Sequence, residues 1–190
     1  NRQYYRFTSE DGSTVIGVVG TSRDENHAFV YLAEHFEQRQ LPVPHILAQS
    51  ADGLRYLQTD LGSTSLFDAI RGGREAGGRY NQHEKQLPNI QIRGARGLDW
   101  QNCYPQPEFD EDSVLFDLNY FKYCFLKPSG LDFHELKLEA NFRLFAKDLT
   151  AENIDSFLYR DFQARNVMLG AEGNPHFIDF QGGRRGPFYY

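Results

Sequence analysis

The chain has 190 residues and a formal net charge of −6; 40% of its residues are hydrophobic and 15% are aromatic. This composition supports a packed core and excludes intrinsic disorder, while the acidic balance excludes a bulk nucleic-acid-binding face. The sequence shows neither the roughly 18-residue apolar run of a membrane helix nor a signal-peptide pattern, and its two cysteines lack metal-ligand spacing. We expect a globular, cytoplasmic protein with no nucleic-acid or membrane partner.

The first 60 residues predict two β-hairpins separated by one helix. Four segments have the composition of strands: Tyr4–Ser9, Thr14–Val19, His45–Gln49 and Leu54–Thr59. An Asp-Gly pair, at 11–12 and again at 52–53, is a strong turn signal within each hairpin. Between the hairpins, residues 24–38 carry apolar side chains at helical spacing, and Asp24 is the expected N-cap.

After residue 60 the pattern becomes mainly helical. A helix begins over Ser65–Ile70, and longer ones are predicted over Ser113–Leu126 and Leu136–Leu149. We expect the apolar residues of the two longer helices to be buried, namely Leu115, Leu118, Phe121, Tyr123, Cys124, Phe125, Phe142, Leu144, Phe145 and Leu149. Two short strands, Val167–Leu169 and His176–Ile178, then form a hairpin.

The most informative residues surround this last hairpin. Asp161 is followed five residues later by Asn166 and a further thirteen later by Asp179, the spacing of a kinase-type phosphoryl-transfer site. The hairpin places Asn166 before its first strand and Asp179 after its second, so both reach one point. Asp161 suits the catalytic base, and Asn166 and Asp179 suit Mg²⁺ ligands. A surface turn capped by Asp and Asn is the alternative, and the Asp-x4-Asn spacing by itself favours that alternative.

The strings YRDFQARNVML and FIDFQGG, with a later GPFYY, resemble the aminoglycoside phosphotransferase/choline kinase-like superfamily. Within it, they are most similar to the bacterial anomeric kinases of N-acetylmuramate and N-acetylglucosamine. The resemblance runs through most of the chain, although only these C-terminal motifs are specific. Tyr159 stands where the family usually has His, and Gly182 stands where the sugar kinases have Asp. The first departure bears on support of the catalytic loop, and the second leaves the substrate open.

This resemblance implies an α+β, protein-kinase-like two-lobe fold. Residues 1–60 would form an N-lobe with a small antiparallel sheet, and residues 61–190 would form a partial, mostly helical C-lobe. We expect the chain to be part of a longer protein, incomplete at both ends. In such a fold adenine binds the hinge backbone, which makes four residues candidates by position, namely Gln58, Thr59, Asp60 and Leu61.

Other candidates are charged or amide side chains. The usual strand Lys of kinases is absent, and Arg2 or Arg6 is the candidate replacement, with an outward-facing surface role as the alternative for Arg6. Arg165 is a candidate to neutralise phosphate charge in the transition state. Gln163 and Gln181 are candidate substrate contacts. Either of two glutamates on the first helix, at positions 25 and 34, is a candidate ion-pair partner, with solvated surface as the alternative.

These residues predict ATP- and Mg²⁺-dependent phosphorylation of a small-molecule hydroxyl. The resemblance points to the anomeric hydroxyl of an N-acetylated amino sugar, a sugar-like substrate. An aminoglycoside or choline-type acceptor is the alternative within the enzyme class. Outside the enzyme class, the alternative is a kinase-like module that binds nucleotide without turnover. The missing Lys, Tyr159 and Gly182 favour such a module. The intact Asp161, Asn166 and Asp179 oppose it.

Overall fold

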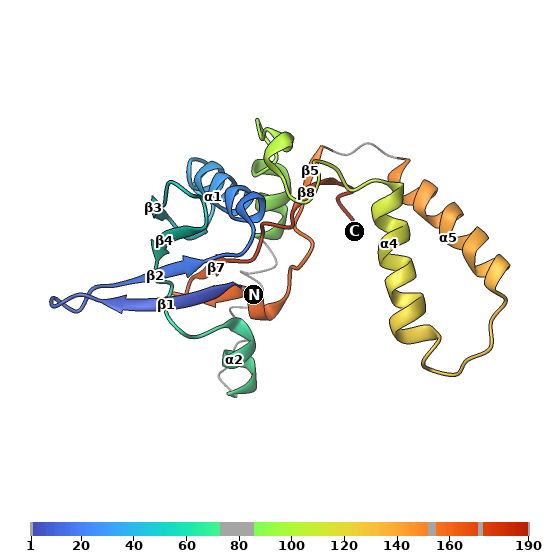
Figure 1. Cartoon of the computed structure of the whole chain (residues 1–190), viewed down its shortest axis with the longest axis horizontal. Helices are drawn as coiled ribbons and strands as arrows, with labels where there is room; N and C mark the ends of the chain where they lie inside the picture. The colour runs from blue at the N-terminus through green and yellow to red at the C-terminus, as the bar shows by residue number, and fades with distance from the viewer. Residues whose placement is uncertain (1, 73–85, 152–154, 171–172, 190) are drawn as a thin grey trace.

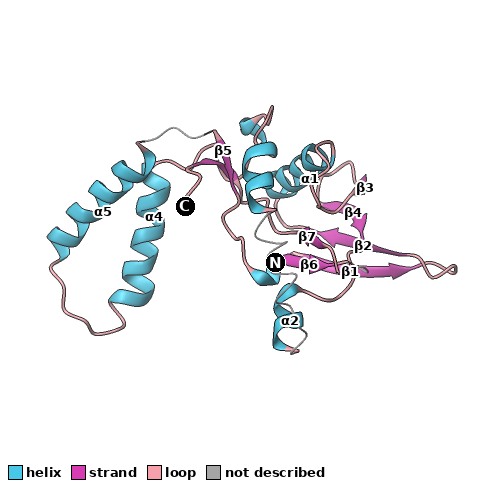
Figure 2. Cartoon of the chain, turned by 180° about the vertical axis from the view of Figure 1, so that it is seen from behind, coloured by secondary structure: helices cyan, strands magenta, loops and turns pink. Residues whose placement is uncertain are grey.

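The computed structural model of the chain describes residues 2–72, 86–151, 155–170 and 173–189. A small sheet with a helix beside it forms one end of the molecule, and a long helical hairpin projects from the other (Figure 1). Between them lie short strands and turns that belong to the last part of the chain (Figure 2). This arrangement has the α+β character expected from the sequence.

The N-terminal sheet is antiparallel, with strand order β1-β2-β4-β3. Its strands are β1 (Gln3–Thr8), β2 (Thr14–Val19), β3 (Ile46–Gln49) and β4 (Arg55–Thr59). Both predicted hairpins are confirmed, and Gly12 and Gly53 supply positive φ angles of 83° and 69° at their turns. Ile16 pairs with Arg6 on one side and Gln58 on the other, so these three side chains share one face of the sheet.

Helix α1 (Arg23–Glu37) packs against the sheet. The predicted N-cap was wrong by two positions, because the Ser22 side chain accepts the hydrogen bond from the Glu25 amide at 3.2 Å. Asp24 instead lies in the first turn, where its charge favours the positive end of the helix dipole. One hydrophobic cluster joins helix, sheet and C-terminal strands, and its members include Phe29, Leu32, Phe36, Tyr56, Phe157, Tyr159, Phe177 and Phe180.

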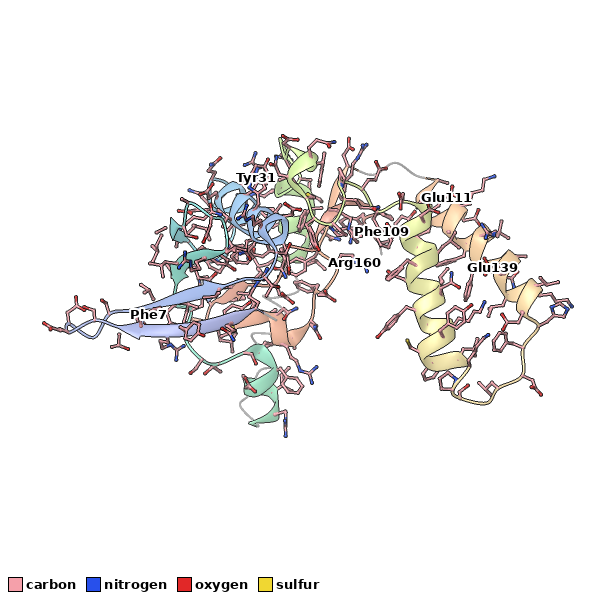
Figure 3. All side chains as sticks on the ribbon, in the orientation of Figure 1. Phe7, Tyr31, Phe109, Glu111, Glu139 and Arg160 are labelled. Atoms are coloured by element: carbon pink, nitrogen blue, oxygen red, sulfur yellow. The ribbon has the colours of Figure 1, made fainter. Side chains whose placement is uncertain are left out.

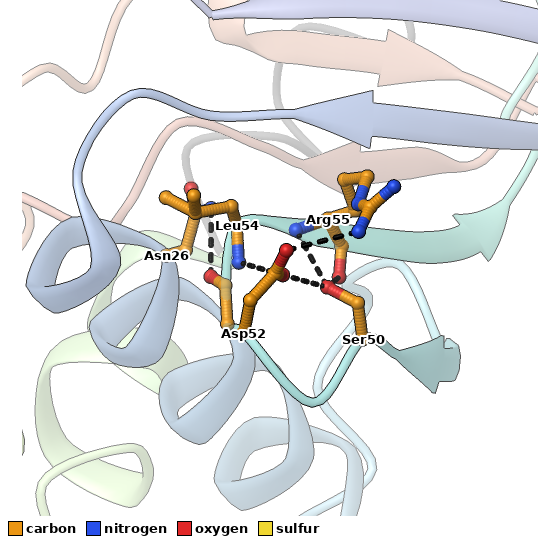
Figure 4. A network of polar contacts seen from close by, with 6 residues as sticks. Asn26, Ser50, Asp52, Leu54 and Arg55 are labelled. Carbon is orange, nitrogen blue, oxygen red and sulfur yellow. Dashed lines mark hydrogen bonds and ion pairs between the residues drawn. The ribbon is translucent and has the colours of Figure 1, made fainter.

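A polar network fixes the β3–β4 turn against the start of α1 (Figure 4). The Asp52 carboxylate accepts hydrogen bonds from Ser50 Oγ at 2.5 Å, the Leu54 amide at 3.0 Å and Arg55 Nη2 at 2.9 Å. The Ser50 hydroxyl, followed by the Leu54 amide, lowers the pKa of Asp52 to about 2. Asn26 of α1 donates from Nδ2 to the Gly53 carbonyl at 3.1 Å. The first turn of α1 is therefore held in a defined orientation.

Helix α2 (Leu66–Arg71) begins with a reciprocal capping box between Ser65 and Asp68, as its predicted start required. The long helices α4 (Glu111–Phe121) and α5 (Glu135–Thr150) pack side by side as the hairpin in Figure 2. Short helical turns complete the helical part: η1 (Asn89–Arg93), η2 (Trp100–Asn102), η3 (Lys122–Leu126) and η4 (Ala164–Asn166).

The two long predicted helices are confirmed, and so is the predicted burial of Phe142, but the predicted burial of their other aromatic residues was wrong. Cys124 is exposed, and five further side chains are 44–62% exposed, namely Phe121, Tyr123, Phe125, Leu144 and Phe145. Three other predicted residues are partly buried: Leu115, Leu118 and Leu149. The fully buried stripe consists of Val114, Phe142 and Ala146. It is narrow because, within the described residues, the hairpin packs mainly against itself and the chain around Leu158.

Two small antiparallel pairs complete the fold. Strand β6 (Val167–Leu169) pairs with β7 (Pro175–Phe177), which confirms the predicted hairpin with its second strand one residue earlier. Strand β5 (Ser156–Leu158) pairs with β8 (Arg184–Gly186), a pairing that the sequence did not reveal. At Gly183 an added Cβ would lie 2.1 Å from the Phe157 ring, so this close approach requires glycine. None of the described helices has the length and apolarity needed to cross a membrane.

Candidate active site

Asp161 follows a tight turn centred on Arg160. The Asp161 amide donates to the Tyr159 carbonyl at 3.1 Å, and Arg160 between them has a φ of +74°. A hydrogen bond across three residues with this φ is typical of a γ-turn, a strained conformation for a residue other than glycine. The turn leaves the Asp161 side chain exposed, where an incoming hydroxyl can reach it.

Tyr159 anchors this turn to the core. Its hydroxyl donates to the Ile178 carbonyl at 2.5 Å, and its ring packs edge-on to Phe162 and Phe177. Burial, reinforced by the charges of Asp179 and Asp161, raises the pKa of the Tyr159 phenol well above its usual value. The phenol therefore remains a hydrogen-bond donor at neutral pH. At the position where the family usually has His, Tyr159 thus joins the catalytic turn to the residue preceding Asp179.

The structure brings Asp161, Asn166 and Asp179 together. Asn166 donates from Nδ2 to the Asp161 carbonyl at 2.9 Å and to Asp179 Oδ2 at 3.2 Å. Asp179 has a φ of +65°, a second left-handed residue at the same site. Because Nδ2 makes both hydrogen bonds, Oδ1 is the atom of Asn166 with which a cation would interact. The linear spacing predicted this convergence.

The candidate metal site contains few negatively charged ligands. Among the described residues, no three His, Cys, Asp or Glu side chains are arranged to hold a metal ion. One carboxylate and one amide nevertheless suit Mg²⁺, which usually retains waters and takes its remaining ligands from substrate phosphates. The residues present therefore fit a magnesium–nucleotide complex better than a metal held by protein alone.

A chain of polar contacts extends from Asp179 to helix α1. Gln181 donates from Nε2 to Asp179 Oδ1 at 2.8 Å and to Glu25 Oε1 at 3.5 Å. Glu25 in turn lies 3.0 Å from Arg2 Nη2, and the Arg2 side chain is only 12% exposed. Of the two predicted arginines and two predicted glutamates, Arg2 and Glu25 are thus the pair beside the metal candidates.

Several buried polar atoms in this region have no hydrogen-bond partner within the described part of the chain. They are Arg2 Nε and Nη2, the Tyr56 hydroxyl, Gln58 Oε1 and Gln181 Oε1; Nη2 is within ion-pair distance of Glu25 but is not aligned for a hydrogen bond. Such atoms cost about 1–3 kcal/mol each when unsatisfied. Burial raises the pKa of Tyr56, which also interacts electrostatically with Arg2, Glu25 and Asp179. The unsatisfied donors of Arg2 and Tyr56 fit an anionic group such as a phosphate, whereas the Gln58 and Gln181 oxygens are acceptors and would need a donor or a cation.

Arg6 takes a different position, beside the segment that follows β4, where the hinge was predicted. Its guanidinium donates to both carboxylate oxygens of Asp60, at 2.6 and 3.0 Å, and to the Gly62 carbonyl at 3.0 Å. Burial acts to raise the pKa of Asp60, but the hydrogen bonds from Arg6 and the Gly62 amide lower it overall. Arg6 therefore ties β1 to the segment that follows β4, and its hydrogen bonds go to Asp60 and Gly62 rather than to the metal candidates.

A polar cavity of about 620 Å³ borders the segment where the hinge was predicted, and among the residues lining it are Asp60, Leu61, Gly62, Leu169 and His176. This volume is in the usual range of small-ligand sites. An apolar groove of about 410 Å³, lined by Tyr5, Phe7 and Leu57 among others, lies on the sheet away from the motif.

The remaining predicted residues are less central. The Thr59 amide donates to the His45 carbonyl at 3.0 Å, so it serves the sheet. The Arg165 guanidinium stacks 4.4 Å from the centre of the Phe67 ring of α2, and the structure does not bring it to Asp161 or Asp179. The exposed Gln163 accepts the Asn166 amide through its carbonyl at 2.8 Å.

Comparison with protein families matches residues 1–190 to the phosphotransferase enzyme family, and the chain belongs to this family. Comparison with curated proteins returns no significant match. Among solved structures, the ternary complex of APH(2'')-IIa with streptomycin and ATP aligns with a TM-score of 0.57 and 14% identity, covering 98% of this chain and 68% of that one. The AMP complex of spectinomycin phosphotransferase APH(9)-Ia aligns with a TM-score of 0.58 and 14% identity, covering 97% and 64%.

A third similar structure is APH(3'')-Id from Streptomyces rimosus, with a TM-score of 0.54, 14% identity and coverage of 98% and 73%. At this identity the likeness concerns the fold, and it confirms the predicted protein-kinase-like fold. The chain spans about two thirds of the length of these structures, from 64% to 73%.

Proposed function

We propose that the chain carries the catalytic site of an ATP-dependent kinase that phosphorylates a hydroxyl group of a small molecule. The observation that carries this proposal is the convergence of Asp161, Asn166 and Asp179 through the two hydrogen bonds of Asn166, at 2.9 and 3.2 Å. Membership of a phosphotransferase family supports it. The same convergence argues against a module that only binds nucleotide, since binding alone does not need an exposed base.

Each residue has a distinct role in this proposal. Asp161 orients the acceptor hydroxyl and takes its proton. Asn166 Oδ1 and the Asp179 carboxylate hold Mg²⁺, which when bound neutralises charge on the transferring phosphate. Arg2, fixed by Glu25, faces the phosphates in place of the missing Lys. Arg165 reaches the reacting phosphate only by leaving the Phe67 ring, so we assign it a role after substrate binding.

The nucleotide base belongs at the hinge in this proposal, at the boundary between an N-lobe of residues 1–60 and a C-lobe of residues 61–190. Because the Thr59 amide is engaged by His45, the backbone of Asp60 and Leu61 is left to contact adenine. Gln58 contributes its buried side chain, and Arg6 holds the hinge through Asp60. ATP and Mg²⁺ as substrates fit a cytoplasmic location.

For the acceptor, we propose the anomeric hydroxyl of an N-acetylated amino sugar. The motif similarity described above supports this choice, and the exposed Gln163 beside Asp161 is the proposed sugar contact. Gln181 is turned toward Asp179 and Glu25, so we assign it to orientation of the metal carboxylate. An aminoglycoside is the second candidate, because streptomycin is bound in one similar structure; choline is a third, with less support.

An ADP-release assay with the full chain tests both levels of the proposal. The acceptors are N-acetylmuramate, N-acetylglucosamine, several aminoglycosides and choline. We expect turnover with an N-acetylated sugar, none with its methyl glycoside, and continued turnover with its 6-deoxy derivative. Phosphorylation of the methyl glycoside would overturn the anomeric assignment alone. Absence of ADP release with every acceptor would favour the non-catalytic module.

A further inference from the structure

The Arg160 side chain leaves the active site and reaches the helical hairpin. Its guanidinium lies with Nη1 2.5 Å from Asp117 Oδ2 and Nη2 3.0 Å from Asp117 Oδ1, so two parallel bonds join the catalytic turn to helix α4. Both side chains are only about a quarter exposed, at 24% and 25%. A bidentate pair of this kind fixes orientation as well as distance, which a single contact between flexible side chains does not.

Phe109 supports the same guanidinium. Arg160 lies 4.7 Å from the centre of the Phe109 ring, and both residues appear where the hairpin joins the rest of the molecule in Figure 3. Phe109 is 3% exposed, and its amide donates to the Arg185 carbonyl of β8 at 2.7 Å. Arg160 is therefore held by Phe109, just before α4, and by Asp117, in the middle of that helix.

The backbone of Arg160 needs such support. Its φ of +74° is unfavourable for a side chain with a Cβ, and such conformations persist when surrounding contacts impose them. Asp161 is the next residue, so any relaxation of the turn redirects its carboxylate. The two hydrogen bonds to Asp117 hold the side chain of Arg160, the strained residue itself.

We propose that Asp117 is a positioning residue, through which helix α4 sets the direction of the Asp161 carboxylate by way of Arg160. This rests on the proposed role of Asp161 as the base. Asp179 is held by Asn166 Nδ2 and Gln181 Nε2, and the residue before it, Ile178, is held by the Tyr159 hydroxyl. Asn166 also donates to the Asp161 carbonyl, a backbone group, and not to the Asp161 carboxylate. Loss of the two hydrogen bonds between Arg160 and Asp117 should therefore impair phosphoryl transfer and leave magnesium–nucleotide binding intact.

The test begins with Asp117→Asn, which keeps the side-chain shape and removes the charge. We expect kcat to fall about ten- to a hundredfold, as misplacement of a catalytic group does, with KM for Mg·ATP within about twofold of wild type. Arg143→Gln is the matched control, because it removes an exposed ion pair with Glu139, at 3.0 Å, on the same hairpin. We expect it to leave kcat unchanged.

A reciprocal exchange separates positioning from simple loss of stability. Arg160→Asp alone should lose activity, whereas Arg160→Asp with Asp117→Arg should recover most of the lost kcat, since Asp tolerates positive φ. An unchanged kcat in Asp117→Asn would overturn the proposal, and so would a parallel loss of kcat, nucleotide affinity and Tm without rescue. Asp161→Asn separates failure of the base assignment from failure of the positioning role. If Asp161→Asn stays active, the base assignment fails. If Asp161→Asn is inactive but Asp117→Asn is fully active, only the positioning role of Asp117 fails.

Discussion

Asp161 reaches solvent because the residue before it adopts a left-handed conformation. Around this exposed carboxylate the other polar groups are engaged with one another: Asn166 with Asp179, and Gln181 with both Asp179 and Glu25. At the scale of single residues the site therefore has an exposed carboxylate, the proposed base, beside a hydrogen-bonded pair of proposed metal ligands. The two halves should fail in different ways when they are altered.

Replacing the base should affect chemistry alone. Asp161→Asn keeps the size of the side chain but removes its ability to take a proton, and general-base catalysis is typically worth 10²–10⁴-fold. We expect turnover to fall by about that factor while ATP affinity stays close to wild type, measured by ADP release and calorimetric titration. Turnover near the wild-type rate would remove Asp161 from the mechanism.

Replacing the metal carboxylate should affect nucleotide binding. Asn166 and Asp179 present hard oxygen ligands, so Mg²⁺ or Mn²⁺ should support activity and Zn²⁺ should not. In Asp179→Ala, we expect ATP binding to lose its dependence on magnesium, as measured by titration with and without the ion. A variant that retains wild-type magnesium dependence would contradict the assignment.

The sequence predicted the convergence of Asn166 and Asp179 because a short hairpin determines both positions. It did not distinguish Arg2 from Arg6 or Glu25 from Glu34, since those choices depend on how the sheet and α1 meet the C-terminal segment. Tyr56 and Asp117 were not identified, because their importance arises from contacts between elements distant in sequence.

At the scale of elements, local patterns identified helices and hairpins well and burial poorly. The periodicity of α4 and α5 predicted two helices, but periodicity states which side chains share a face and not what covers that face. The β5–β8 pair was not predicted, because each strand has only three residues, and β8 consists of two arginines and a glycine, which carry little strand signal. The pair depends instead on Gly183, the residue just before β8, where a Cβ would meet the Phe157 ring.

Adjacent glycines allow a matched test of that pair. A Cβ at Gly183 would lie 2.1 Å from the Phe157 ring, whereas a Cβ at Gly182 would meet nothing within 4 Å. We expect Gly183→Ala to destabilise the protein by about 1–3 kcal/mol, as overpacking does, and Gly182→Ala to be nearly neutral in chemical denaturation. Equal stability of the two variants would show that the β5–β8 contact is not as close as described.

At the scale of the whole molecule, the most unusual property is the aromatic surface of the helical hairpin. Phe116 and Leu136 are 72% and 78% exposed, respectively, and surfaces of this kind commonly mark interaction sites or aggregation. Each Å² of apolar area left in water forgoes on the order of 25 cal/mol. The hairpin therefore stabilises the molecule less than its size suggests.

We expect the 190-residue chain to bind a hydrophobic dye through this surface. Phe116→Lys with Leu136→Lys should reduce dye fluorescence without lowering Tm, because neither side chain is packed in the core. Arg143→Gln, an exposed change on the same hairpin, provides the control. Absence of dye binding by the unaltered chain would contradict the expectation.

The β5–β8 pair also has a consequence for the order in which the molecule folds. It closes a loop from Tyr159 to Gly183 that contains the proposed base and both proposed metal ligands. Contacts within a short loop form sooner than contacts across a long chain. Gln181 and Glu25 are 156 residues apart in sequence. We therefore expect the segment with the proposed base and metal ligands to acquire its shape early, and the proposed phosphate contact of Arg2 to form last, when the N-terminal sheet docks.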